Sequence, residues 1–156
     1  MINNKGVTII ELLIAIGLTA LITAIGTASF SQWRSHISLA NQIDEFKSKV
    51  VEIRQLAIAA AGETNWGIHL ESDQYIVFSG DSYNELEPNN KIVNLRNISI
   101  LNATSSLSNG IGSFSPDLIF TKFTGQTSNT GTIELIYNND VDITRSITID
   151  ELGKIN

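Results

Sequence analysis

The chain has 156 residues, a formal net charge of −6 at pH 7, 42% hydrophobic residues and no cysteine. This length suits one domain, or one small domain with an appendage. The lack of cysteine excludes disulfides, thiolate chemistry and zinc thiolate sites, and the acidic balance argues against a nucleic-acid-binding surface.

The first predicted element is an apolar run from Val7 to Phe30, which contains a single charged residue, Glu11. A helix of this length would be about 36 Å long, enough to cross a hydrocarbon core of about 30 Å. A cleaved secretory signal has a shorter apolar stretch, so we interpret the run as an uncleaved transmembrane helix. Lys5 is the nearest positive charge, which predicts a cytoplasmic N-terminus.

Glu11 is unexpected in a simple membrane anchor. A carboxylate just inside the bilayer costs about 2 to 3 kcal/mol, and such acids generally have a partner there. A cut between Gly6 and Val7 would create an α-amino group about one helical turn from Glu11. We expect Glu11 to pair with this amine, either at its own helix N-terminus or on a neighbouring chain whose helix packs alongside.

The eight residues from Lys5 to Leu12, KGVTIIEL, resemble the type IV prepilin processing motif. Val7 replaces the commoner phenylalanine. The resemblance implies that an integral-membrane prepilin peptidase cuts after Gly6 and N-methylates Val7, and that Glu11 acts in filament assembly. Residues 1–6 would be the leader, which keeps the new terminus unavailable until it is removed.

An amphipathic continuation of the helix is predicted over residues 31–61, with Gly62 as its C-terminal stop. Its polar face contains the possible helix pairs Asp44–Lys47 and Glu45–Lys49. Its apolar residues recur at steps of three and four, as expected for a helix that covers a sheet: Trp33, Ile37, Ala40, Ile43, Phe46, Val50, Ile53, Ala57 and Ala60.

After Gly62 the hydrophobic period changes to two, which predicts a β-rich region over residues 62–156. Turn residues separate about seven short strands, an arrangement typical of a small antiparallel sheet or β-sandwich. The expected strands lie at 66–70, 74–78, 91–95, 98–101, 117–120, 132–137 and 143–149. We therefore expect an α+β protein, with a long N-terminal helix whose first half (7–30) spans the membrane and whose second half (31–61) packs on the sheet. This is the pilin fold that the resemblance implies.

Several pieces of the β-rich region are similar to GspH/FimT-type pseudopilins, minor subunits that carry a β-sandwich after the helix. They occur in the same order from about Gln55 to the end of the chain: Asn65–Ile68, Ile119–Thr121, Thr124–Gly125, Gly131–Leu135, Ile147–Ile149 and Leu152–Ile155. The lack of a cysteine pair also fits, because many major pilins close a C-terminal loop with a disulfide.

No enzyme and no cofactor is predicted. His36 and His69 have no cysteine partner, and no serine lies in a G-x-S-x-G elbow. His69 with Glu71 and Asp73 could imitate a metal-ligand cluster, but an outward strand face that runs into a turn explains them better. Calcium stays an alternative reading of two acidic loops, although neither has EF-hand spacing: Asp81, Glu85 and Glu87, and Asp140 and Asp142.

Two function hypotheses follow. The first is a minor pilin or pseudopilin of a type IV pilus or type II secretion machine, held in the bacterial inner membrane with its C-terminal domain outside the cytoplasm. Its expected partners are the prepilin peptidase, other subunits, the assembly platform and, before assembly, membrane lipid. The alternative is a FimT-like pilus-tip subunit that captures DNA. The last nineteen residues argue against it, because Arg145 and Lys154 are outnumbered by four acids, whereas DNA capture needs clustered cations.

Overall fold

The structure, a computed structural model, describes residues 6–109, 113–137 and 140–156. The side chains at 25–29, 31–32 and 140–141 also lie outside the described residues, as does most of the predicted leader. The chain forms two compact units, Met1–His36 and Ile37–Asn156. The predicted α+β class is confirmed, since one long helix is followed by two antiparallel sheets.

Helix α1 spans Ile9–Ile58, so the predicted helix is present but ends earlier than expected. The turn that ends it uses Ala60, which adopts a left-handed conformation with φ of 49° and donates its N–H to the Ala57 carbonyl at 2.9 Å. A short 3₁₀ turn, η1 (Ala61–Glu63), follows and contains Gly62 at φ 72°. The predicted stop at Gly62 was therefore wrong, because an alanine takes the left-handed position that glycine usually occupies.

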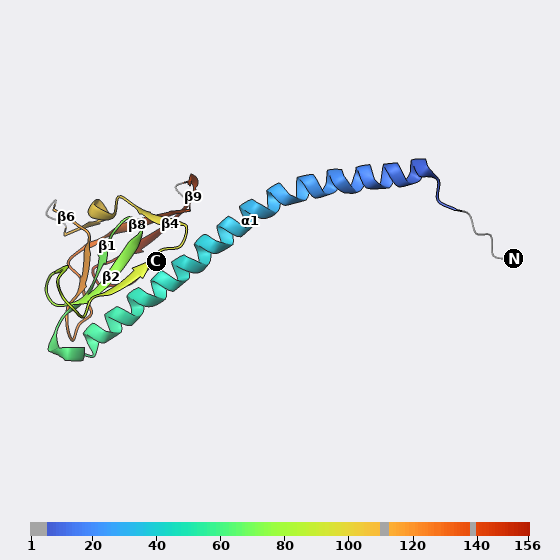
Figure 1. Cartoon of the computed structure of the whole chain (residues 1–156). Helices are drawn as coiled ribbons and strands as arrows, with labels where there is room; N and C mark the ends of the chain where they lie inside the picture. The colour runs from blue at the N-terminus through green and yellow to red at the C-terminus, as the bar shows by residue number, and fades with distance from the viewer. Residues whose placement is uncertain (1–5, 110–112, 138–139) are drawn as a thin grey trace. The chain divides into compact units, whose positions relative to one another are not determined.

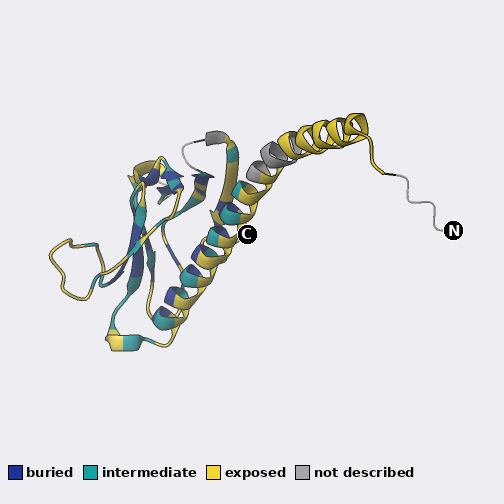
Figure 2. Cartoon of the chain, turned by 45° about the vertical axis from the view of Figure 1, so that its right-hand side comes forward, coloured by how far each residue is buried: buried dark blue, intermediate teal, exposed yellow. Residues whose placement is uncertain are grey.

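In the first unit, every residue described from Gly6 to Ala24 is exposed (Figure 2). The large apolar side chains there are between 56% and 80% exposed. Among the described residues, no helix has a stretch that is long and apolar enough to span a bilayer. The predicted span, 7–30, includes side chains outside those residues, so it stays a prediction.

The second unit contains two antiparallel sheets, of which Figure 1 labels several strands. The first has the order β3-β2-β1-β7: β1 (Trp66–Leu70), β2 (Gln74–Ser79), β3 (Lys91–Asn94) and β7 (Asp117–Phe120). In the second, β8 pairs with β4, β5 and β9, and β5 pairs with β6: β4 (Ile98–Leu101), β5 (Leu107–Ser108), β6 (Phe114–Ser115), β8 (Thr130–Tyr137) and β9 (Asp140–Ile149). A second 3₁₀ turn, η2 (Ala103–Ser105), lies between β4 and β5. All seven predicted strands are present, and β5 and β6 are additional.

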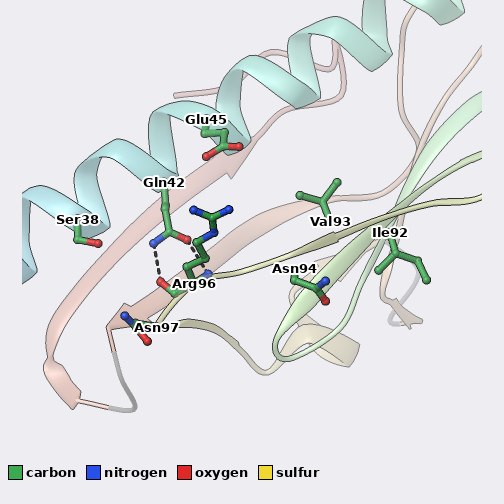
Figure 3. Close-up of a pocket in the computed structure, with 8 residues that line it drawn as sticks. All are labelled: Ser38, Gln42, Glu45, Ile92, Val93, Asn94, Arg96 and Asn97. Carbon is green, nitrogen blue, oxygen red and sulfur yellow. Dashed lines mark hydrogen bonds between the residues drawn. The ribbon is translucent and has the colours of Figure 1, made fainter.

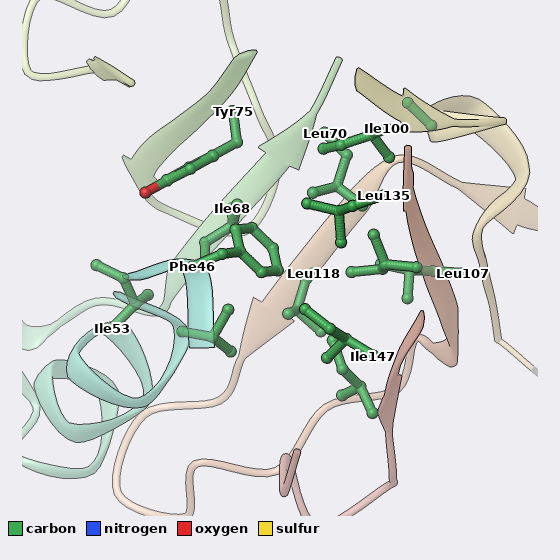
Figure 4. Close-up of a cluster of buried hydrophobic side chains, with 14 of the residues drawn as sticks. Phe46, Ile53, Ile68, Leu70, Tyr75, Ile100, Leu107, Leu118, Leu135 and Ile147 are labelled. Carbon is green, nitrogen blue, oxygen red and sulfur yellow. The ribbon is translucent and has the colours of Figure 1, made fainter. Parts of the chain in front are cut away.

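The core of the second unit joins α1 to both sheets. One buried cluster contains Phe46 and Ile53 of α1, Ile68 and Leu118 of the first sheet and Leu135 of the second (Figure 4). Phe46 packs edge-to-face on Tyr75, with 5.1 Å between the ring centroids. The buried side chains of α1 are Leu39, Ile43, Phe46, Val50, Ile53 and Ala57.

The start of the predicted apolar stripe was wrong. Trp33, Ile37 and Ala40 are exposed, and Leu39, which the prediction omitted, is 1% exposed. Trp33 belongs to the first unit, whereas the compact second unit begins at Ile37. On the polar face, Lys49 pairs with Glu52 at 2.6 Å instead of with Glu45.

Candidate processing and assembly site

The predicted cleavage site lies immediately before α1. Val7 is 77% exposed. Gly6 has no atom within 4 Å of the position that a Cβ would take, and its φ is not in the left-handed range. Within the described residues, the fold therefore gives no reason for a glycine at position 6. A requirement for glycine there would come from a molecule that approaches the backbone closely.

Glu11 forms a capping box with Thr8, the residue before α1. The Thr8 N–H and hydroxyl donate to Glu11 Oε2 at 2.9 and 2.8 Å, and the Glu11 N–H donates to Thr8 Oγ1 at 3.3 Å. Two N–H groups that the helix leaves unpaired are satisfied in this way. The T-x-x-E spacing is a known sequence signature of a helix start, but we predicted a role for Glu11 only in charge pairing and overlooked this signal.

The capping box also holds the Glu11 carboxylate next to the backbone that precedes α1. Glu11 Oε2 lies 2.9 Å from the Thr8 nitrogen, and consecutive Cα atoms are about 3.8 Å apart. A free amine on Val7 would therefore lie within a few ångströms of the carboxylate. In the structure the Glu11 carboxylate is held by Thr8, and the pairing of Glu11 with a Val7 amine stays a prediction.

The cluster around His69 differs from the predicted one. His69 Nδ1 lies 2.5 Å from Asp117 Oδ1, on the neighbouring strand β7, and Nε2 lies 3.9 Å from Glu71. The ring stacks on Tyr83 with 4.0 Å between centroids. Burial, followed by the charges of Glu71, Glu85 and Asp117, raises the pKa of the Tyr83 hydroxyl. No sequence signal indicated Asp117, because its contact depends on the pairing of β1 with β7.

The described residues contain no group of three or more His, Cys, Asp or Glu side chains that could hold a metal ion. The described members of the two acidic loops are all exposed: Asp81, Glu85, Glu87 and Asp142. Arg145 and Lys154, the two cations considered for the DNA alternative, are also exposed, and so is His36. The side chain of Asp140 lies outside the described residues.

No family model, curated protein or solved structure matches the chain. The resemblance to prepilins therefore rests on the sequence from Lys5 to Leu12, of which Ile9 to Leu12 belong to α1.

Proposed function

We propose that this protein is a minor pilin or pseudopilin, a subunit of a type IV pilus or type II secretion filament. In this proposal a prepilin peptidase cuts the chain between Gly6 and Val7 and methylates the new amine of Val7. The observation that carries the proposal is the KGVTIIEL sequence at the start of a helix whose described apolar side chains, up to Ile22, are all exposed.

This exposed apolar surface supports a membrane or filament location. Soluble monomers rarely leave contiguous apolar patches of more than a few hundred square ångströms uncovered. Lipid would cover residues 7–30 before assembly, with the chain as a single-pass protein of the inner membrane and its C-terminal domain outside the cytoplasm. Helices of other subunits would cover the same residues in the filament, after extraction by the assembly platform.

Glu11 has two successive tasks in this proposal. Before assembly it caps α1 through Thr8, as in the structure. In a filament it would pair with the methylated amine of Val7 on a neighbouring subunit. An unpaired charge is costly in a low-dielectric surrounding and a paired one is tolerated, so the pairing would favour helices packed in one register. The α+β order of the chain is in keeping with a pilin fold, in which the sheets form a β-sandwich on the second half of the helix.

Mass spectrometry of the membrane-extracted protein tests the proposal. Cells with an active prepilin peptidase should yield a chain that begins at methylated Val7. Gly6→Phe should remain uncut, and because no atom lies within 4 Å of the Cβ position, the substitution should leave the fold intact. A matched control, Gly17→Phe, should be cut normally. An uncut chain in peptidase-positive cells would contradict the proposal.

A further inference from the structure

Strand β3 is one of the two edges of the first sheet, and its outer side has open backbone groups. It pairs only with β2, in the register Tyr75↔Val93 and Ile76↔Ile92. The next bond of this ladder runs from the Leu95 N–H to the Asp73 carbonyl at 2.9 Å. Antiparallel pairs alternate between bonded and non-bonded partners, so Val93 also faces β2. The N–H and C=O groups of Ile92 and Asn94 therefore face away from the sheet.

Both ends of this open edge are closed by groups of the chain itself. At one end, the Gln42 side chain of α1 donates from Nε2 to the Arg96 carbonyl at 2.6 Å and accepts from the Arg96 N–H at Oε1, at 3.0 Å (Figure 3). The carboxamide thus pairs with the backbone as one residue of an added strand would. At the other end, Asn90 donates its N–H to the Glu87 carbonyl. Ile92 and Asn94 remain open between them, within the described residues.

The opposite edge of the same sheet is closed at one of its outward residues by side chains. The Leu70 N–H bonds to the Pro116 carbonyl, and bonded partners alternate along an antiparallel pair. The outward residues of β7 are therefore Asp117 and Ile119. The Asp117 carbonyl accepts from Asn129 Nδ2 at 2.7 Å and its N–H donates to Ser115 Oγ at 3.0 Å. Natural sheets generally block their edges in such ways to prevent unwanted pairing. The two edges differ in that side chains close Asp117 of β7, whereas neither Ile92 nor Asn94 of β3 is closed among the described residues.

A groove between α1 and β3 leaves room for an added strand. A hollow of about 700 Å³ lies between Ser38, Gln42 and Glu45 of α1 and residues 92–97. Figure 3 shows the Arg96 guanidinium turned into this hollow, on the side of Glu45. Ile92 is 61% exposed and lies on the opposite face of the strand from Val93, which packs on the core. An added strand would thus meet polar groups on one face and Ile92 on the other.

The charges at this edge indicate what the added strand contains. Lys91 and Arg96 stand at the two ends of the open edge, and neither makes an ion pair within the described part of the chain. Glu45 is the single acid that lines the same hollow. A second copy that paired through its own β3, with Ile92 opposite Asn94, would bring Lys91 of one chain next to Arg96 of the other. Repulsion between these cations disfavours that arrangement.

We propose that the edge of β3 binds an extended segment of a partner protein, which adds a strand to the sheet and carries an acidic residue at each end. The segment forms backbone hydrogen bonds to Ile92 and Asn94, and its acids approach Lys91 and Arg96. Strand addition of this kind obtains affinity from the main chain and specificity from the side chains. The inference uses the second unit alone and does not depend on the proposed function.

The test uses the full chain in detergent micelles and a fluorescent synthetic peptide. The peptide contains six residues of alternating valine and threonine, with an aspartate at each end. Amide hydrogen exchange of the free chain should be fast at Ile92 and Asn94 and slow at Val93 and Leu95. The peptide should slow exchange at Ile92 and Asn94 at least tenfold. Methylation of alternate peptide nitrogens should abolish binding measured by anisotropy.

Charge reversal separates this site from nonspecific attraction. Arg96→Glu should weaken binding of the aspartate peptide at least tenfold, and a peptide with lysine ends should recover the loss. Arg145→Glu, an equal charge change at an exposed residue of β9, should leave binding unchanged.

Three results would overturn the inference. The first is slow amide exchange at Ile92 and Asn94 in the free chain. Protection that rises with protein concentration would indicate pairing with a second copy, and protection that is independent of concentration would indicate an edge closed by the chain itself. The second is binding that is insensitive to peptide methylation. The third is equal weakening by Arg96→Glu and Arg145→Glu. None of these results bears on cleavage at Gly6, so failure here and failure of the proposed function can be distinguished.

Discussion

The two parts of α1 are both rich in apolar residues, but they differ in how far these side chains are exposed. Between Val7 and Ile22 the large apolar side chains are exposed, whereas between Leu39 and Ala57 the side chains of one face are buried against the sheets. The second part buries its apolar face within the chain, at roughly 25 cal/mol per Å² of apolar surface. The described side chains of the first part have no such cover in their own unit, and in the proposed function lipid or the helices of other subunits would cover them.

The same charge placed in both parts of α1 should have very different effects on folding. Phe46 is 1% exposed and Ile14 is 56% exposed. Phe46→Asp removes a buried ring and leaves an unpaired carboxylate in the core, so we expect a loss of about 4 kcal/mol or more in the free energy of unfolding. Ile14→Asp should leave unfolding of the β-rich unit unchanged. Urea denaturation in a nonionic detergent, followed by circular dichroism, measures both, and equal losses would refute the contrast.

Glycines provide a second, smaller contrast. A Cβ at Gly131 on β8 would lie 2.3 Å from the Ser106 carbonyl oxygen of the neighbouring chain segment, and one at Gly17 would have no atom within 4 Å. Gly131→Ala should therefore destabilise the second unit by about 2 to 3 kcal/mol. Gly17→Ala should cause no loss, since alanine favours the helix. A Gly131→Ala melting temperature equal to that of the wild type would show that the β5–β8 contact is looser than the structure indicates.

The third contrast is a pH dependence confined to the buried part. Burial, followed by the charges of Glu45 and Glu52, raises the pKa of Tyr75 to about 12. An unfolded tyrosine titrates near 10, so above that pH the unfolded chain binds fewer protons than the folded one. Stability should therefore be unaffected below about pH 10 and should fall between about pH 10 and 12, by up to about 2 kcal/mol. Tyr75→Phe should remove this component from the alkaline unfolding curve; an unchanged curve would contradict the assignment.

The sequence predicted the strands well because their alternation and turn residues are local signals. It predicted the ends of the helix less well. The phase of the stripe at Leu39 depends on where the core of the second unit begins, and the stop at Ala60 depends on an alanine in an uncommon conformation. The contact between His69 and Asp117, and the open edge at Ile92 and Asn94, depend on strand order. No residue pattern along the chain reveals that order.

For the candidate site, we predicted Gly6, Val7 and Glu11 from the sequence but not the capping box, although the T-x-x-E spacing is a local signal for it. This omission matters, because capping offers a second explanation for an acid at position 11. A glutamine can fill the same place in a capping box, whereas it cannot pair as a charge with an amine. The two explanations therefore separate in one substitution.

The most direct test of the proposed role is the recovery of Glu11→Gln in filaments, compared with the wild type and with Glu11→Leu. Each variant is first checked for cleavage at Gly6 by mass spectrometry and then quantified in the sheared or pulled-down filament fraction. We predict that Glu11→Gln is cut normally but recovered at least tenfold less than the wild type, close to Glu11→Leu, because both leave the Val7 amine without a charged partner. Recovery of cleaved Glu11→Gln at wild-type levels would contradict the charge pairing with the Val7 amine and would leave helix capping as the role of Glu11.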